Sequence, residues 1–400
     1  MATQRTIFSG GIDCLLAVND IATRSMVKYA PIPHGESVVL AEAGNLVVMR
    51  HPTHLEVWRL GEADRDLAES GGDWGAPGSI LKLSTEPQKI LQLHSKDDET
   101  IRCCAVSPDG RWVAYATCTR LRAYRLALAD QVLLERASVE CDIEMAHHIK
   151  FLDGGRKMVS ATEKGSLQFF EVNEREMSVR LIETLEGKDL HLIAGISHLA
   201  ATAKGDVLVV ADYAGNVSSL DANSRRFLAR MPKYQRAAVT ALSLNPANSD
   251  LLVLAYADNH VVECHAQSGR YSKFSKSNLE TAFPKQWKSK KTATRGAVQL
   301  GLEQLVLWDD ANICVVERRG EGGDVSAAPR SKQAREGGES TTPAAAKKRD
   351  ARQVRITRKY EHLVHLGALS DGALVAVEVR PQSIEEQLPP SLRQKKFGAM

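Results

Sequence analysis

The chain has 400 residues, of which 43% are hydrophobic and 25% are charged, with 28 glycines and 14 prolines. This composition excludes collagen, wholesale disorder and a mucin-like stalk, and it provides enough apolar material for a large buried core. The 52 basic and 49 acidic residues nearly balance, with a formal net charge of +3, so the distribution of charge is more informative than its sum.

Neither a membrane span nor a disulfide framework is predicted. The longest apolar runs, such as Leu251 to Ala257, are far shorter than the roughly 20 residues of a membrane helix. No apolar stretch of signal-peptide length follows the N-terminus, so we expect neither secretion nor a membrane partner. Seven cysteines at irregular spacing, without a CxxC pair, predict reduced thiols that pack as small hydrophobic side chains.

A repeated unit recurs along the chain, in which a short turn containing Asp, Asn, Gly or His joins two β-rich apolar runs. The first apolar residue after each turn recurs at intervals of 40, 66, 46, 50, 44 and 52 residues. Blades of WD-type propellers repeat about every 40–45 residues, with four strands each. The repeat predicts an all-β fold, a seven-bladed WD-type β-propeller, and a β-sandwich with long loops is the alternative. The seven positions are Leu15, Leu55, Leu121, Leu167, Val217, Val261 and Ile313.

The turns and the runs beside them support this prediction. Asp109-Gly110, between residues 101–106 and 112–117, offers the positive φ that a tight turn requires, and Asp153-Gly154-Gly155 repeats the pattern. The second run of each unit consists of alanine and other apolar residues, which is typical of a strand buried on both faces. Carboxylates at or near the turns predict capping of backbone N–H groups. These carboxylates are Asp13, Asp212, Asp258 and Asp310.

We expect the propeller to occupy residues 1–381 and to carry two insertions. Residues 61–79 form an acidic, glycine-rich loop, and residues 319–353 lack periodicity and are predicted to be a disordered basic insertion. Residues 382–400 are predicted to be an extended basic tail, suited to lying in a partner's groove. The chain starts abruptly inside a blade and ends with surplus strands, so residues 362–379 are expected to pair beside residues 6–18 and close the ring.

The sequence gives little support to catalysis, a cofactor or a small-molecule substrate. It has no GxxxxGK[ST] loop, HExxH, GxSxG, GxGxxG or EF-hand loop. His147-His148 and Cys103-Cys104 are the nearest approach to a metal cluster, but adjacent residues of a strand point to opposite faces. Ser197-His198, near His191, lacks a placed acid, so we interpret it as polar decoration of a strand. A propeller hydrolase would need acids or histidines that converge in the central funnel, which the sequence does not indicate.

Basic side chains are concentrated in loops and in the tail. Residues 330–359 contain ten basic and three acidic residues, an excess of +7, whereas the whole chain has only +3. Such segments either contact phosphates or are simply solvated. Trp287, among lysines, either stacks on a base or anchors its loop. The candidate RNA- or partner-contacting residues are Lys285, Trp287, Lys288, Lys290, Lys291, Arg295, Lys347, Lys348, Arg349, Arg393, Lys395 and Lys396.

The C-terminal sequence from Leu374 to Gly398, LVAVEVRPQSIEEQLPPSLRQKKFG, resembles the end of the cirhin family, WD-repeat nucleolar proteins of the small-subunit processome. That family ends with a Leu-Val-x-Val-Glu strand, a Leu-Pro-Pro linker and a basic close, and residues 55–61 and 252–263 match it as well. The family is longer, with two propellers in tandem, and this chain resembles the second. It departs from the pattern in keeping few Trp-Asp blade endings and in the extra Val379.

The resemblance implies a non-enzymatic scaffold in the nucleus and nucleolus. Its partners would be other early-assembling processome proteins, the 5′ external spacer of the ribosomal RNA precursor and the U3 small nucleolar ribonucleoprotein. Pre-18S rRNA processing and rRNA transcription would depend on it. The alternative is a WD-repeat adaptor of another complex, such as the substrate receptor of a ubiquitin ligase.

Overall fold

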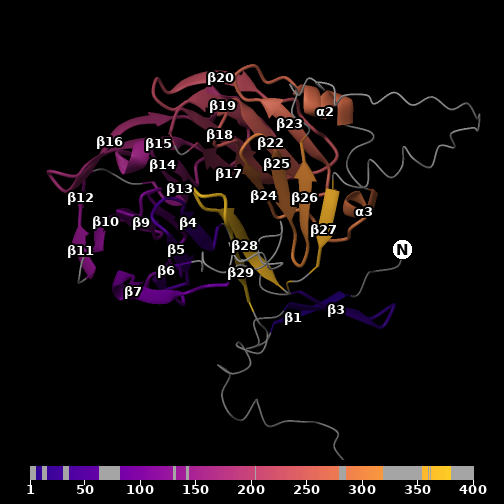
Figure 1. Cartoon of the computed structure of the whole chain (residues 1–400), viewed down its shortest axis with the longest axis horizontal. Helices are drawn as coiled ribbons and strands as arrows, with labels where there is room; N and C mark the ends of the chain where they lie inside the picture. Colours follow the sequence, from indigo (N-terminus) through magenta and orange to yellow (C-terminus); the bar gives the residue numbers. More distant parts are fainter. Residues whose placement is uncertain are drawn as a thin grey trace, which may run out of the picture.

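The computed structural model is all-β, and short sheets make up nearly all of its regular structure (Figure 1). It describes residues 6–10, 16–29, 36–62, 82–128, 132–140, 144–202, 204–278, 285–318, 354–358, 360 and 362–379. This architecture is consistent with a β-propeller.

Six sheets of three to five strands follow one another along the chain, each built mainly from consecutive antiparallel strands. The first comprises β4 (Val38–Ala41), β5 (Leu46–Arg50), β6 (His54–Arg59) and β7 (Gln88–His94), and the second comprises β8 (Cys103–Val106), β9 (Trp112–Ala116), β10 (Leu121–Leu128) and β11 (Val132–Arg136). The third comprises β13 (Ala146–Leu152), β14 (Lys157–Thr162), β15 (Leu167–Asn173) and β16 (Ser178–Leu185), with β12 (Ser138–Glu140) added in parallel beside β16.

The fourth sheet comprises β17 (Ile196–Ala201), β18 (Val207–Asp212), β19 (Val217–Asp221) and β20 (Arg226–Arg230), and the fifth comprises β21 (Val239–Leu244), β22 (Leu251–Tyr256) and β23 (Val261–His265). The sixth comprises β24 (Gly296–Leu300), β25 (Gln304–Trp308), β26 (Ile313–Glu317) and β27 (Val354–Thr357). Two α-helices, α2 (Lys273–Asn278) and α3 (Lys285–Lys288), lie between the fifth and sixth sheets in sequence, and three 3₁₀ turns are η2 (Lys96–Asp98), η3 (Asp153–Gly155) and η4 (Gly187–Leu190).

The predicted repeat corresponds to these sheets. Leu121, Leu167, Val217, Val261 and Ile313 each begin the third strand of a sheet, and Leu55 is the second residue of β6. Leu15 lies outside the described residues.

The second strands are buried as predicted. Every residue of β9 and β18 is buried, because each of these strands has a neighbouring sheet on both faces. The conformation of the turn explains why Gly155 is a glycine in the repeated Asp-Gly turn pattern. Its φ is +93°, and an added Cβ would lie 3.1 Å from the Cβ of Ser107 on the preceding sheet.

Apolar side chains join each sheet to the next. Six buried clusters lie between consecutive sheets, from β4–β7 with β8–β11 to β24–β27 with the last sheet, which comprises β28 (Leu363–Ala368) and β29 (Leu374–Glu378). Figure 1 shows the sheets side by side around a common centre, with β4, β13, β17, β24 and β28 toward it. The hydrophobic core is therefore divided among the contacts between sheets.

The strands near the two chain ends do not pair as predicted. β1 (Thr6–Gly10), β2 (Leu16–Asp20) and β3 (Ser25–Tyr29) form a sheet of their own, and β28 pairs with β29 in another, so no ladder joins residues 362–379 to the described part of 6–18. Hairpins between neighbours in sequence close short loops, which costs less entropy than long-range pairing. β28 instead contacts β24 and β4, and Ser370 N–H donates to the Glu42 carbonyl oxygen at 3.1 Å.

Four of the five described cysteines pack in the core as predicted, whereas Cys118 does not. Cys103, Cys104, Cys264 and Cys314 are buried, Cys118 is exposed, and all five are free thiols. Burial raises the pKa of Cys104, Cys264 and Cys314 to about 12, so these thiols are protonated at neutral pH. Of the predicted insertions and tail, only Gly61 and Glu62 lie within the described residues.

Candidate nucleic-acid interface

The basic segment at residues 285–295 is held to the core by its tryptophan. Trp287, in α3, is fully buried in the apolar cluster between the fifth and sixth sheets. Its indole N–H donates to Thr294 Oγ1 at 3.1 Å, which joins the helix to the chain just before β24. Of the two interpretations of Trp287, the burial of the ring and this hydrogen bond favour the anchoring one.

Asn259 holds the rest of this segment in place. It lies in the turn between β22 and β23 with φ +61°, a conformation that asparagine tolerates better than most residues. Its amide nitrogen donates to the carbonyl oxygens of Lys290 (3.2 Å) and Thr292 (2.9 Å). Its side-chain oxygen accepts from the Thr294 N–H at 2.7 Å and from the Thr294 hydroxyl at 2.8 Å. One buried side chain therefore fixes the backbone of residues 290–294.

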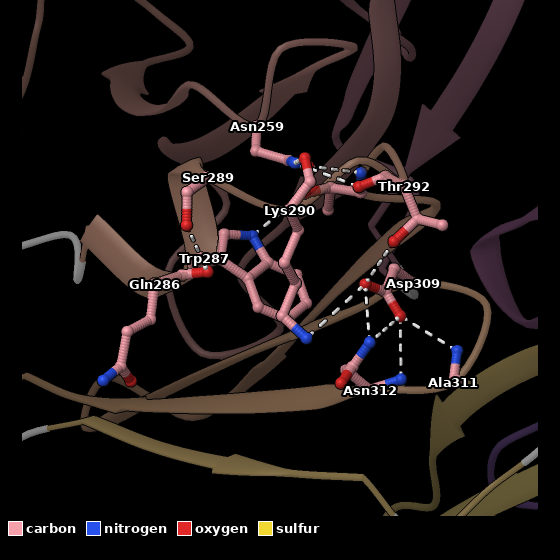
Figure 2. Close-up of polar contacts among 10 residues, drawn as sticks. Asn259, Gln286, Trp287, Ser289, Lys290, Thr292, Asp309, Ala311 and Asn312 are labelled. Atoms are coloured by element: carbon pink, nitrogen blue, oxygen red, sulfur yellow. Dashed lines mark hydrogen bonds and ion pairs between the residues drawn. The ribbon is translucent and has the colours of Figure 1, made fainter.

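Lys290 has a structural role in the described structure. Its ammonium group lies 4.0 Å from a carboxylate oxygen of Asp309 and 5.3 Å from the centre of the Trp287 ring (Figure 2). Asp309 is fully buried and accepts from the Thr292 hydroxyl at 2.8 Å and from the Asn312 N–H at 2.7 Å. A buried carboxylate needs both hydrogen bonds and a compensating charge, and the ammonium group of Lys290 supplies that charge to Asp309.

Arg295 is likewise paired. Its guanidinium lies 2.8 Å from a carboxylate oxygen of Asp310 and donates to the Leu363 carbonyl oxygen at 3.4 Å. Asp310 was predicted to cap a turn, and this is wrong. Asp309 caps it through the N–H groups of Ala311 and Asn312, while the carboxylate of Asp310 faces Arg295.

The capping prediction holds at the two other carboxylates that the structure describes. Burial opposes ionisation of Asp212, but hydrogen bonds from Asn216, Ile193 and Ala194 outweigh it and lower the pKa of this carboxyl. Asp258 accepts from the His260 N–H at 3.1 Å. Asp13 lies outside the described residues.

Lys288 and Lys291 are exposed, as is the paired Arg295, and Lys288 lies close enough to His260 for its charge to act on that ring. The rings of Tyr234 and His260 stack with centroids 4.6 Å apart, and Tyr234 also packs at 4.7 Å on the buried ring of Tyr256. Burial lowers the pKa of His260, and the nearby charges of Lys288 and Arg236 lower it further.

We define the basic-aromatic surface as Tyr234, Arg236, His260 and Lys288, together with Lys291, which is exposed three residues further along the same segment. A neighbouring carboxylate, Asp258, accepts from the Tyr234 hydroxyl at 2.6 Å. Exposed cations beside a stacked aromatic pair are the chemistry that single-stranded nucleic acid requires. Tyr234 and His260 are not among the residues that the sequence predicts for an interface. Their signal was an aromatic between basic residues in Lys233-Tyr234-Gln235-Arg236, but nothing in the sequence linked it to Lys288.

The other candidate residues are not placed. The side chains of Lys285, Lys347, Lys348, Arg349, Arg393, Lys395 and Lys396 lie outside the described residues.

Titratable residues converge at the centre of the molecule, which the sequence did not indicate. His148, His198 and His365 come from β13, β17 and β28, and Lys150 Nζ lies 2.7 Å from a carboxylate oxygen of Glu36. Burial lowers the pKa of His148 and of His365 to about 4, with Glu36 close enough to oppose the shift in both. Inner strands of successive sheets meet here, and a linear sequence does not display that convergence.

This central group does not form a catalytic triad among the described residues. Ser197 lies 3.0 Å from His198 Nδ1, but its hydroxyl donates to the Ala211 carbonyl oxygen at 3.1 Å. His198 Nε2 lies 3.2 Å from the Thr240 carbonyl oxygen, where a triad would have a carboxylate. His191 packs against Phe227. The interpretation of Ser197-His198 as polar decoration therefore agrees with the geometry.

Within the part of the chain that the structure describes, one group of three potential ligands is close enough to hold a metal ion. It consists of His51, His54 and Glu56 on the first sheet. Among the described residues, no helix has the length and apolar character needed to cross a membrane.

Comparison with known proteins identifies distant relatives. The mouse protein "U3 small nucleolar RNA-associated protein 4 homolog", also called cirhin, is 27% identical over 410 aligned positions, which cover 98% of this chain and 56% of the relative. The human homolog is 25% identical with the same coverage, and the Schizosaccharomyces pombe protein is 22% identical over 70% of this chain and 38% of its own length. This chain spans about half the length of the mammalian relatives. No family model matches it.

Proposed function

We propose that this protein is a non-enzymatic scaffold in ribosome biogenesis, acting within the small-subunit processome in pre-18S rRNA processing and rRNA transcription. The observation that carries the proposal is the similarity, over nearly the whole chain, to proteins named for their association with U3 small nucleolar RNA. Its location would be the nucleus and nucleolus. His198, the central histidine that contacts a serine, faces the Thr240 carbonyl oxygen where a triad would have a carboxylate, which favours a scaffold over a hydrolase.

The scaffold would be a seven-bladed WD-type β-propeller over residues 1–381, closed between β28–β29 and the first sheet. In support, β4, β8, β13, β17, β21, β24 and β28 contact one another in that order, and β28 in turn contacts β4. Closure of this kind leaves no open inner edge, and a rigid ring offers two faces and a rim to partners. Residues 382–400 would be an extended tail in a partner's groove.

The partners would be other early-assembling processome proteins, the U3 ribonucleoprotein and the 5′ external spacer of pre-rRNA. RNA would meet the basic-aromatic surface, where Lys288 and Lys291 contact phosphates and Tyr234 offers a ring face. Lys347–Arg349 in the basic insertion, and Arg393, Lys395 and Lys396 in the tail, would add contacts. Lys290 and Arg295 would act indirectly, because their described partners are Asp309 and Asp310.

Affinity purification of the tagged chain from growing cells tests this function against the adaptor alternative. We expect recovery of U3 RNA, pre-rRNA and processome proteins, with a propeller of similar size from an unrelated complex as the control. Recovery of ubiquitin-ligase subunits without U3 RNA would instead support an adaptor and reject the scaffold.

A further inference from the structure

The first sheet carries three histidines and a glutamate close together at one end. His51 follows β5, His54 begins β6, and Glu56 lies two residues further along the strand. Side chains alternate along a strand, so His54 and Glu56 share a face, whereas Leu55 and Val57 are fully buried against the second sheet. His94, at the end of β7, is directly opposite His54 in the ladder.

The potential ligand atoms of this group converge. His51 Nε2 lies 3.8 Å from Glu56 Oε2, and His54 Nε2 lies 4.0 Å from Glu56 Oε1. One ligand atom from each of the three residues lies within 4.8 Å of the others. The rings of His51 and His54 stack at 4.5 Å, and those of His54 and His94 at 5.2 Å. His51 Nε2 is buried and has no hydrogen-bond partner in the described structure, which is a cost that a metal bond would remove.

Neighbouring groups hold these ligands in place. The Trp58 indole N–H donates to Glu56 Oε2 at 3.0 Å, an outer contact of the kind that orients carboxylate ligands. The turn is tied by the His51 N–H to the His54 carbonyl oxygen at 2.9 Å and by the Ile101 N–H to the Pro52 carbonyl oxygen at 2.7 Å. Lys89 Nζ lies 3.1 Å from Glu56 Oε1 and is the cation that now compensates this carboxylate.

We propose that His51, His54 and Glu56 form a binding site for a divalent transition-metal ion of the Zn²⁺ class. Two imidazoles and a carboxylate are a typical zinc ligand set, with bonds of about 2.0–2.2 Å. Tetrahedral ligands at that distance lie about 3.3 Å apart, so small side-chain rotations would bring these atoms into range. Water or His94 would take the fourth position, and Lys89 would move away from Glu56.

Isothermal titration calorimetry of Zn²⁺ into the full chain, after treatment with a chelator, tests the site. The visible spectrum of bound Co²⁺ is a second probe. We expect one ion per chain. His54→Gln and Glu56→Gln should each weaken binding at least tenfold, whereas His147→Gln, which removes an imidazole from another sheet, should leave it unchanged. Lys89→Gln removes a competing positive charge and should tighten binding about tenfold. Melting curves in EDTA verify that each variant is folded.

Where the ligand variants fold, either of two results would overturn the proposal. One is the absence of saturable binding to the wild-type chain. The other is binding that neither His54→Gln nor Glu56→Gln alters, since the ion would then lie elsewhere. If a ligand variant fails to fold, Lys89→Gln still decides, because Lys89 is 41% exposed and its replacement leaves all three ligands intact. Unchanged affinity in Lys89→Gln would then reject the site.

Discussion

Replacement of Trp287 by alanine removes a fully buried indole from the cluster between the fifth and sixth sheets. Replacing a buried tryptophan by alanine typically lowers the free energy of unfolding by about 3–5 kcal/mol. The lost hydrogen bond to Thr294 is of the kind that contributes about 1 kcal/mol. Domains typically have only about 5–15 kcal/mol of stability, so the loss would be severe. Trp287→Phe keeps most of the apolar volume and should cost much less than the alanine variant.

Equilibrium urea unfolding, followed by far-UV circular dichroism, measures these differences. Lys288→Ala, an exposed position in the same helix, is the matched control and should change stability by less than about 0.5 kcal/mol. If Trp287 instead stacked on a base, its replacement by alanine would lower RNA affinity and leave stability unchanged. If Trp287→Ala retained wild-type stability and lost only RNA affinity, the anchoring role would be refuted.

Two further predictions concern other parts of the molecule. Replacing residues 319–353 by a short Gly-Ser linker should leave the melting temperature nearly unchanged, because β26 and β27 on either side are hydrogen-bonded neighbours; a fall of many degrees would show that the segment is packed. Burial lowers the pKa of His148 and His365 to about 4, against about 6.5 in an unfolded chain, so the unfolded chain binds more protons below pH 6.5. Their contribution to the free energy of unfolding is complete above pH 6.5 and is lost as the pH falls toward 4. At pH 5 the loss is about 1–2 kcal/mol for each histidine. Urea midpoints at pH 7.5 and 5 should differ less in His365→Gln than in the wild type, and an equal difference would contradict this.

Much of the fold could be predicted because it depends on local pattern. Turn residues such as Asp109-Gly110 and the wholly buried second strands leave a signal at a regular spacing, and the structure places sheets there. The pairing of the chain ends depends on contacts between distant segments. No residue in β1 or β29 specifies the other strand as its neighbour, so the predicted ladder was wrong.

The candidate site could be predicted only in part, for the same reason. Basic composition identified Lys288 and Lys291, which are exposed, and also Lys290 and Arg295, which face acids from the adjacent turn. The sequence shows where basic residues occur, but it does not show which of them form ion pairs with a carboxylate in the folded chain. Tyr234 lies more than 50 residues from Lys288 and joins it only because successive sheets stand side by side.

UV crosslinking in cells, read by sequencing the RNA bound to the tagged chain, tests most directly whether this protein works on ribosomal RNA precursors through its basic-aromatic surface. We expect enrichment of U3 and 5′ external spacer sequences. Lys288→Glu/Lys291→Glu should cause a marked loss of this enrichment, and a charge-reversed pair on the third sheet, Lys157→Glu/Arg180→Glu, should cause little loss. Background levels of those RNAs in the wild type would contradict the function, and equal enrichment in both variants would contradict the surface.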